Sequence, residues 1–254
     1  MIVNADDLAY DEGRNTAILA LLERGLVDRA TVMANMPGFD DAATRVRAAG
    51  LEQRVGIHLV LSEGTPLTEG IRRLPTFCDA NGEFRQWRYE HIRPWLPRAE
   101  RDALVAELTA QVERCRAHGL PVAHLDSHHH VHNEPSVALT VIRAAKRAGI
   151  ESIRIARNCQ PDLRGPKRAY KSAFNALLRA QGLAASRLFG TLDDLESLLS
   201  RPGDTRWSTS FELMVHPDLA EDGSIVESGR PGRPLDLELE RLRGGGSQIA
   251  NRVL

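Results

Sequence analysis

The sequence has few cysteines, no long apolar run and almost no net charge. Its three cysteines are odd in number and none is spaced as CxxC, so neither a disulfide framework nor a zinc knuckle is indicated. No apolar run approaches the roughly 18 residues that a membrane span needs. The formal net charge is −1, from 33 basic and 34 acidic residues, which gives no electrostatic case for nucleic acid or an anionic membrane as partner.

The 254 residues, 42% hydrophobic and 26% charged, have the composition of an ordinary globular protein and suffice for one large α/β domain or two small ones. The N-terminus reaches the candidate site residue Asp6 within a few positions. We therefore expect no signal peptide and a cytoplasmic location.

A recurring glycine marks the ends of the predicted helices. Each of five glycines is followed at once by Leu or Ile, and most of them follow a stretch of apolar residues at helical spacing. Glycine just past a helix favours the left-handed C-cap, because it takes a positive φ without steric cost. The five are Gly25, Gly50, Gly119, Gly149 and Gly182.

Short apolar segments alternate with these helices. They cover residues 2–5, 27–33, 55–61, 122–125, 153–156 and 208–215, with a weaker candidate beginning at Leu188. This alternation predicts a parallel sheet with helices outside it. We expect one α/β domain over residues 1–254, a distorted β/α barrel of six to seven parallel strands, with an open doubly wound sheet as the alternative.

Polar residues gather where four of these strands end. The residues are Asp6 and Asp7, His58, the block from Asp126 to His132, and His216. In β/α barrels the chemistry lies where strands finish and loops begin. We therefore expect these carboxylates and imidazoles to meet at one rim.

The block after Asp126 is the strongest motif, with four histidines in five positions. Neutral imidazole is a common ligand of borderline metals. As an i, i+4 pair, His128 and His132 would share one face of a helical turn. We expect at least two of the four rings to form hydrogen bonds outside the metal's own ligand shell.

The remaining candidates also have structural explanations when they are taken singly. Asp6 or Asp7 could cap the following helix. His58 and His216 each belong to an apolar strand or its end, where a lone histidine is more often part of the core. Their convergence on one rim is what favours a functional role.

A carboxylate and two imidazoles around one divalent metal leave positions open for water and substrate, which is typical of a catalytic site. Such a metal lowers the pKa of its water to roughly 7 and polarises a bound carbonyl. A nearby carboxylate can take the proton of the water, and an imidazole on the opposite side can protonate a leaving nitrogen. The sequence therefore predicts hydrolysis of an amide.

These motifs resemble those of the YdjC-type carbohydrate deacetylases. The resemblance rests on Val3–Asp7, Gly56–Leu59, His124–His132 and Glu212–Pro217, and it spans residues 3 to 217. The chain departs from the family where Leu8-Ala9-Tyr10 replaces the frequent Phe-Gly, and in its Gly-rich tail.

The resemblance implies a barrel related to polysaccharide deacetylases that removes an N-acetyl group from an amino sugar. It implies Asp7, His58 and His128 as metal ligands, Asp6 as general base and His216 as general acid. Members are commonly described with magnesium, whereas two imidazoles favour zinc, so one Mg²⁺ or Zn²⁺ is expected. The substrate is an oligosaccharide or, as in relatives of hopanoid-lipid biosynthesis, a glycolipid, and a homodimer is plausible.

Further residues are expected to bind substrate or to support the ligands. They are Asp126, His132, Arg154 and Glu212, together with Arg157. Residues 62–95 form a long loop, of a length that is usually functional or poorly ordered. We expect its Trp87 and Trp95 to pin the loop onto the barrel, with stacking on sugar rings as the alternative. The atypical tail, residues 243–254, is interpreted as a flexible join.

Two other functions compete with this one. The first is another metal-dependent amidohydrolase or a phosphoesterase that uses the same rim. Amidohydrolase barrels usually carry HxH on the first strand, whereas in this sequence that pattern lies mid-chain. Phosphoesterases generally use a second metal with more carboxylates, and the sequence has few spare carboxylates for one. The second is a sugar- or metal-binding protein without catalysis, which would not need Asp6 beside Asp7.

Overall fold

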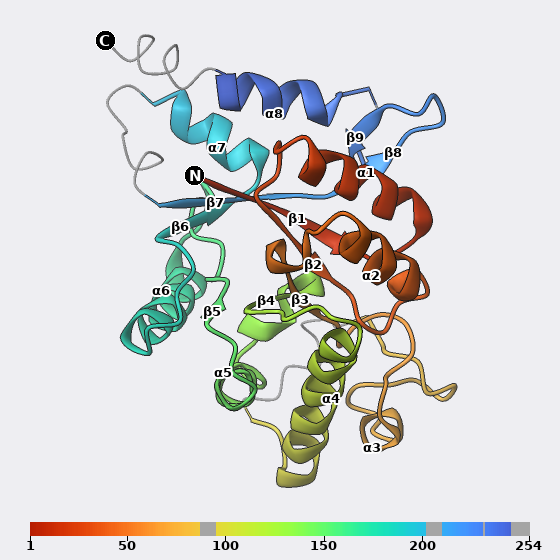
Figure 1. Cartoon of the computed structure of the whole chain (residues 1–254). Coiled ribbons are helices and arrows are strands. Elements are labelled where there is room, and N and C mark those ends of the chain that lie inside the picture. The colour runs from red at the N-terminus through yellow and green to blue at the C-terminus, as the bar shows by residue number, and fades with distance from the viewer. Residues whose placement is uncertain (87–94, 202–209, 231, 245–254) are drawn as a thin grey trace.

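The structure, a computed structural model, describes residues 1–86, 95–201, 210–230 and 232–244, and a sheet of seven parallel strands lies at its centre (Figure 1). The strands are β1 (Ile2–Leu8), β2 (Arg29–Val32), β3 (Val55–Leu59), β4 (His124–Ser127), β5 (Ser152–Ile153), β6 (Leu188–Gly190) and β7 (Phe211–Val215). Their order is β5-β4-β3-β2-β1-β7-β6. Since all these pairings are parallel, the carboxyl ends of the strands face one way.

The two edges of this sheet meet through an isolated bridge. Ile153 at the end of β5 pairs in parallel with Ala184, before β6, and its amide donates to the carbonyl of Leu183 at 2.7 Å. The sheet therefore curls round until its edges touch without forming a continuous ladder. The predicted single α/β domain with a distorted barrel of six to seven parallel strands is confirmed, and the open doubly wound alternative is wrong.

Helices lie around the sheet (Figure 1). They are α1 (Glu12–Glu23), α2 (Phe39–Ala48), α3 (Glu69–Arg72), α4 (Arg98–Ala117), α5 (Ala138–Arg147), α6 (Gly165–Ala180), α7 (Leu192–Leu199) and α8 (Leu235–Gly244). The five glycines predicted to end helices follow the C-caps of α1, α2, α4, α5 and α6, with φ between 67° and 82°. That prediction is confirmed. Among the described residues, no helix combines the length and apolar character that crossing a membrane requires.

Several strands are shorter than the apolar segments that predicted them. Residues 27–33 contain only the four residues of β2. Strand β4 begins at His124, because Val122 takes a left-handed φ of 47°. The weak candidate at Leu188 is a strand. After β7, a separate antiparallel pair, β8 (Pro217–Leu219) and β9 (Ile225–Glu227), packs on α1.

The long loop is partly ordered by α3 and by a bridge between Cys78 and Phe84. Trp87 lies outside the described residues. Trp95 is 72% exposed, so the prediction that it pins the loop onto the barrel is wrong. The end of the Gly-rich tail, from residue 245 onward, also lies outside the described residues.

Gly56 in β3 leaves room for an imidazole from the neighbouring strand β4. A Cβ at this position would lie 2.4 Å from the ring of His124, far inside van der Waals contact. Burial, together with the charges of Arg29 and Arg154, holds the pKa of His124 well below its ordinary 6.5, so this ring is neutral. It acts as a packing element below the rim.

We expect Gly56→Ala to lower the free energy of unfolding by roughly 1–3 kcal/mol, because the added methyl group forces the ring or the strand to move. Gly70→Ala is the control, since a Cβ there meets nothing within 4 Å. Urea unfolding of both variants measures the effect. Equal midpoints for Gly56→Ala and the wild type would contradict this packing.

Candidate functional site

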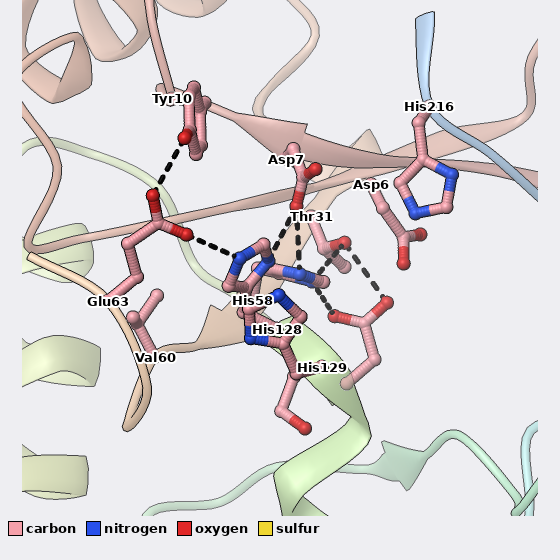
Figure 2. A network of polar contacts seen from close by, with 12 residues as sticks. Asp6, Asp7, Tyr10, Thr31, His58, Val60, Glu63, His128, His129 and His216 are labelled. Carbon is pink, nitrogen blue, oxygen red and sulfur yellow. Dashed lines mark hydrogen bonds and ion pairs between the residues drawn. The ribbon is translucent and has the colours of Figure 1, made fainter. Parts of the chain in front are cut away.

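Four strands bring the predicted site residues to one rim (Figure 2). Asp6 and Asp7 lie near the end of β1, His58 lies in β3, His128 follows β4, and His216 follows β7. Figure 2 shows Asp7, His58 and His128 pointing toward one another, with Asp6 and His216 toward one side of the view.

One carboxylate oxygen of Asp7 is shared by two imidazoles. Oδ1 lies 3.2 Å from Nε2 of His58 and 3.0 Å from Nδ1 of His128. The other oxygen accepts a hydrogen bond from Arg14 at 2.9 Å. Burial raises the pKa of Asp7, but the hydrogen bonds from His128 and His58 outweigh it and hold this pKa well below its usual range. The three residues predicted to ligate a metal are thus in mutual contact.

Asp6 and Asp7 are adjacent in sequence and face different partners. Asp7 has a left-handed φ of 66°, a conformation that costs a non-glycine residue about 1–2 kcal/mol. Asp6 instead accepts hydrogen bonds from Arg154 at 2.6 and 2.7 Å and from Asn4 at 2.8 Å. Strained backbone of this kind is concentrated at functional sites.

Asp126 fixes the ring of His58. The two residues are register partners on β3 and β4, and Oδ1 of Asp126 lies 2.7 Å from Nδ1 of His58. This contact leaves Nε2 facing Asp7. Burial lowers the pKa of His58, but Asp126 and Asp7 outweigh it and raise this pKa to about 10, so the pocket stabilises a positive charge at this point.

Arg154, which follows β5 and is 1% exposed, binds three buried carboxylates. Nε donates to Glu212 at 2.6 Å, the two terminal nitrogens bind Asp6, and one of them also lies 2.7 Å from Asp126. Arg157, by contrast, pairs with Asp194 on α7 and not with these groups. The expected supporting residues Asp126, Arg154 and Glu212 therefore form one cluster under the rim.

The histidine block does not form the regular helical turn that its spacing predicts. His129 and His130 both have left-handed backbone, with φ of 53° and 58°, and this kink directs the other two rings to different partners. His128 faces Asp7, whereas His132 bonds Oγ of Ser127 at 2.6 Å and the carbonyl of Arg154 at 3.0 Å. The expectation of a shared face for His128 and His132 is wrong.

His216 is held by Glu227 from β9. Nδ1 of the ring lies 3.1 Å from Oε1 of Glu227, and the backbone amide of His216 donates to Oε2 at 3.0 Å. Burial lowers the pKa of His216, but Glu227, Asp6 and Asp7 outweigh it and raise this pKa above its ordinary 6.5.

Four residues at the site were missed by reasoning from the sequence: Tyr10, Arg14, Glu63 and Glu227. Arg14 lies on α1 and binds Asp7, and Glu63 lies in the long loop and contacts His128. Tyr10, Arg14 and Glu63 do not lie at strand ends, and Glu227 ends β9, a strand of the separate hairpin. The strand-end pattern therefore carried no signal for them.

The donor set fits a divalent cation. Suitable atoms of Asp7, His58 and His128 all lie within 4.8 Å of one another. Each imidazole turns one nitrogen to Asp7 and the other to a second carboxylate, that of Asp126 or Glu63. Histidines that bind metals usually have such a partner on the second nitrogen.

Comparisons with known proteins identify the family. The family model described as YdjC-like protein matches residues 1–242. A carbohydrate deacetylase of Geobacillus stearothermophilus is 38% identical over 216 residues, covering 85% of this chain and 78% of the relative. A chitooligosaccharide deacetylase of Yersinia pestis is 31% identical over 232 residues, covering 90% and 85%.

A solved structure shares the fold. It is a protein of Enterococcus faecalis named for a proposed cellobiose-phosphate cleavage activity. The TM-score is 0.66 at 19% identity, and the match covers 98% of this chain and 92% of the other.

We expect Arg154→Met to lower the free energy of unfolding at pH 7 by roughly 3–5 kcal/mol, because it leaves buried carboxylates without their partner. In the wild type, Arg154 holds the pKa of Asp6 in the folded protein below its value in the unfolded chain. The stabilisation from this ion pair is therefore fully present at pH values above the unfolded pKa, and it is lost as the pH falls toward the folded pKa. In the variant, buried carboxylates are expected to keep protons in the folded state. The difference between the two proteins should therefore shrink from pH 7 to pH 4.5 in urea unfolding, and a constant difference would contradict this account.

Proposed function

This chain belongs to the YdjC-like family, as its motifs predict, and we propose that it is a metal-dependent hydrolase that removes an N-acetyl group from an amino sugar. The observation that carries the proposal is the convergence of Asp7, His58 and His128, with Asp6 and His216 at the same rim. The relatives named carbohydrate deacetylase and chitooligosaccharide deacetylase support the reaction class. The chain is accordingly a hydrolase of carbon–nitrogen amide bonds.

In this proposal Asp7, His58 and His128 would hold one divalent metal ion, because Oδ1 of Asp7 faces Nε2 of His58 and Nδ1 of His128. When bound, such an ion lowers the pKa of a water molecule and polarises the amide carbonyl. Two imidazole ligands favour Zn²⁺ over Mg²⁺, because magnesium prefers oxygen ligands.

We assign the general base to Asp6. Burial raises its pKa, but Arg154 outweighs burial and holds the pKa of Asp6 well below its usual range, so the carboxylate is ionised at neutral pH and can accept a proton. The same pairing makes Asp6 a weak base, so a proton that it accepts leaves again readily. Arg154 binds both oxygens and thereby sets the direction of the carboxylate.

We assign the general acid to His216. Its raised pKa favours the imidazolium ion near neutral pH, which can donate a proton to the leaving nitrogen. Glu227 binds both the ring and the backbone of His216, so the separate β8–β9 hairpin orients the acid.

The substrate class favoured by the relatives' names is an amino-sugar oligosaccharide, with a glycolipid as the alternative. A cytoplasmic location and a homodimer stay predictions from the sequence. A two-metal phosphoesterase is less favoured, because the other buried carboxylates near the rim, those of Asp6, Asp126 and Glu212, are already bound by Arg154. A protein that only binds sugar or metal would not need Asp6 and His216 at the rim.

The proposal is tested by acetate release from a panel of N-acetylated amino sugars with metal-loaded protein. We expect release by the wild type and a loss of about 10²–10⁴-fold in kcat for Asp6→Asn, with metal content retained. Metal content and Tm serve as controls. Full activity of Asp6→Asn would remove the base assignment, and no release by metal-loaded wild type would favour another hydrolase.

The link between Glu227 and His216 predicts a pH effect. If His216 donates a proton, kcat/KM falls as pH rises through its pKa. Glu227→Gln removes a negative charge that raises this pKa, so the alkaline limb of the profile should move to lower pH. Glu221→Gln, an exposed change between β8 and β9, is the control. An unmoved alkaline limb in Glu227→Gln would separate His216 from the proton donor.

A further inference from the structure

We propose that Glu63 is a positioning residue that holds His128 in the orientation needed to bind the metal, an inference that rests on the proposed function. His128 presents Nδ1 to Asp7 and turns Nε2 toward Glu63, whose Oε2 lies 2.9 Å away. A carboxylate on one imidazole nitrogen keeps the proton on that nitrogen and fixes the ring. A metal that replaced the proton between Nδ1 and Asp7 would then meet the lone pair of Nδ1.

Glu63 stands behind the ring and is not itself a metal ligand in this arrangement. The two nitrogens of an imidazole point in diverging directions. A group that binds Nε2 of His128 therefore lies away from the point shared by Nδ1, Asp7 and His58. The contact acts on the metal through His128.

The two imidazole ligands are supported from different parts of the molecule. Asp126, behind His58, belongs to the sheet and is 1% exposed. Glu63, behind His128, belongs to the long loop, and its side chain is 34% exposed. The sheet therefore fixes His58, whereas the orientation of His128 depends on a loop.

Glu63 closes a ring of contacts that returns to the metal ligands. Its Oε1 accepts a hydrogen bond from the hydroxyl of Tyr10 at 2.7 Å, and the backbone amide of Tyr10 donates to the carbonyl of Asp7 at 3.1 Å. Figure 2 shows Tyr10, Glu63, His128 and Asp7 in this sequence of contacts. Both neighbours of His128 are thus tied to the turn after β1.

Helix α4 fixes the loop on either side of Glu63. The buried amide of Gln111 binds the backbone N–H and C=O of Val60 at 3.0 and 2.8 Å. The buried carboxylate of Glu107 accepts from the amide of Leu67 at 3.0 Å. The position of Glu63 is therefore set by buried hydrogen bonds to the loop backbone.

Metal binding, measured by calorimetry with Co²⁺ as the probe, tests this role. We expect Glu63→Ala to weaken Co²⁺ binding about 10–100-fold, as is typical when the partner of a metal-bound histidine is removed. Glu63→Gln should recover to within about fivefold of the wild type, because its amide oxygen still accepts from Nε2. Glu69→Ala, a carboxylate of the same loop whose side chain is 68% exposed, should leave the affinity unchanged.

The outcomes separate this inference from the proposed function. If the wild type binds Co²⁺ and Glu63→Ala binds it equally well, the positioning role is overturned and the metal site stands. If Glu63→Gln is as weak as Glu63→Ala, a role through the hydrogen bond is overturned. If the wild type binds no Co²⁺, the metal site and the inference fail together. Should Glu63→Ala lose its fold, Tyr10→Phe replaces it, with an expected loss of about fivefold, and an unchanged affinity again overturns the role.

Discussion

The buried guanidinium group of Arg154 is the interaction on which the rim depends. It joins Asp6 on β1, Asp126 on β4 and Glu212 on β7, each at 2.6–2.7 Å. A buried charge is costly unless hydrogen bonds satisfy it, and all three guanidinium nitrogens have a carboxylate partner here. Because Asp126 in turn fixes His58, one side chain sets the direction of both the proposed base and a proposed metal ligand.

The charges around this cluster favour a further cation. Four carboxylates face three guanidinium groups: Asp6, Asp7, Asp126 and Glu212 against Arg14, Arg29 and Arg154. One negative charge remains among these seven groups. The nearby carboxylates also raise the pKa values of two imidazoles: Asp126 and Asp7 raise that of His58, and Glu227, with Asp6 and Asp7, raises that of His216. A divalent ion next to Asp7 would balance this negative charge, so the electrostatics and the ligand chemistry both favour the proposed metal site.

Strand ends and helix ends could be predicted from the sequence because both follow local rules. Alternating apolar segments give the strands, glycine gives the helix ends, and parallel strands bring their carboxyl ends together. The contacts made by the long loop and by the separate β8–β9 hairpin follow no such period, which is why Glu63 and Glu227 were missed. The direction of His132 was predicted wrongly because left-handed backbone at His129 and His130 interrupts the helical spacing. Side-chain spacing does not encode that kink.

The isolated bridge between Ile153 and Ala184 gives the barrel wall a seam. A wall with few backbone hydrogen bonds along one line can open there transiently, as local unfolding does. Arg154 follows Ile153 directly and reaches Glu212 on β7, beyond β6, so its side chain spans this seam. The residue that aims the proposed base thus also helps to keep the wall closed. A substitution of Arg154 would therefore disturb both the proposed base and the contact that keeps the barrel wall closed. Changes in substrate preference are expected instead from substitutions in the loops and the β8–β9 hairpin.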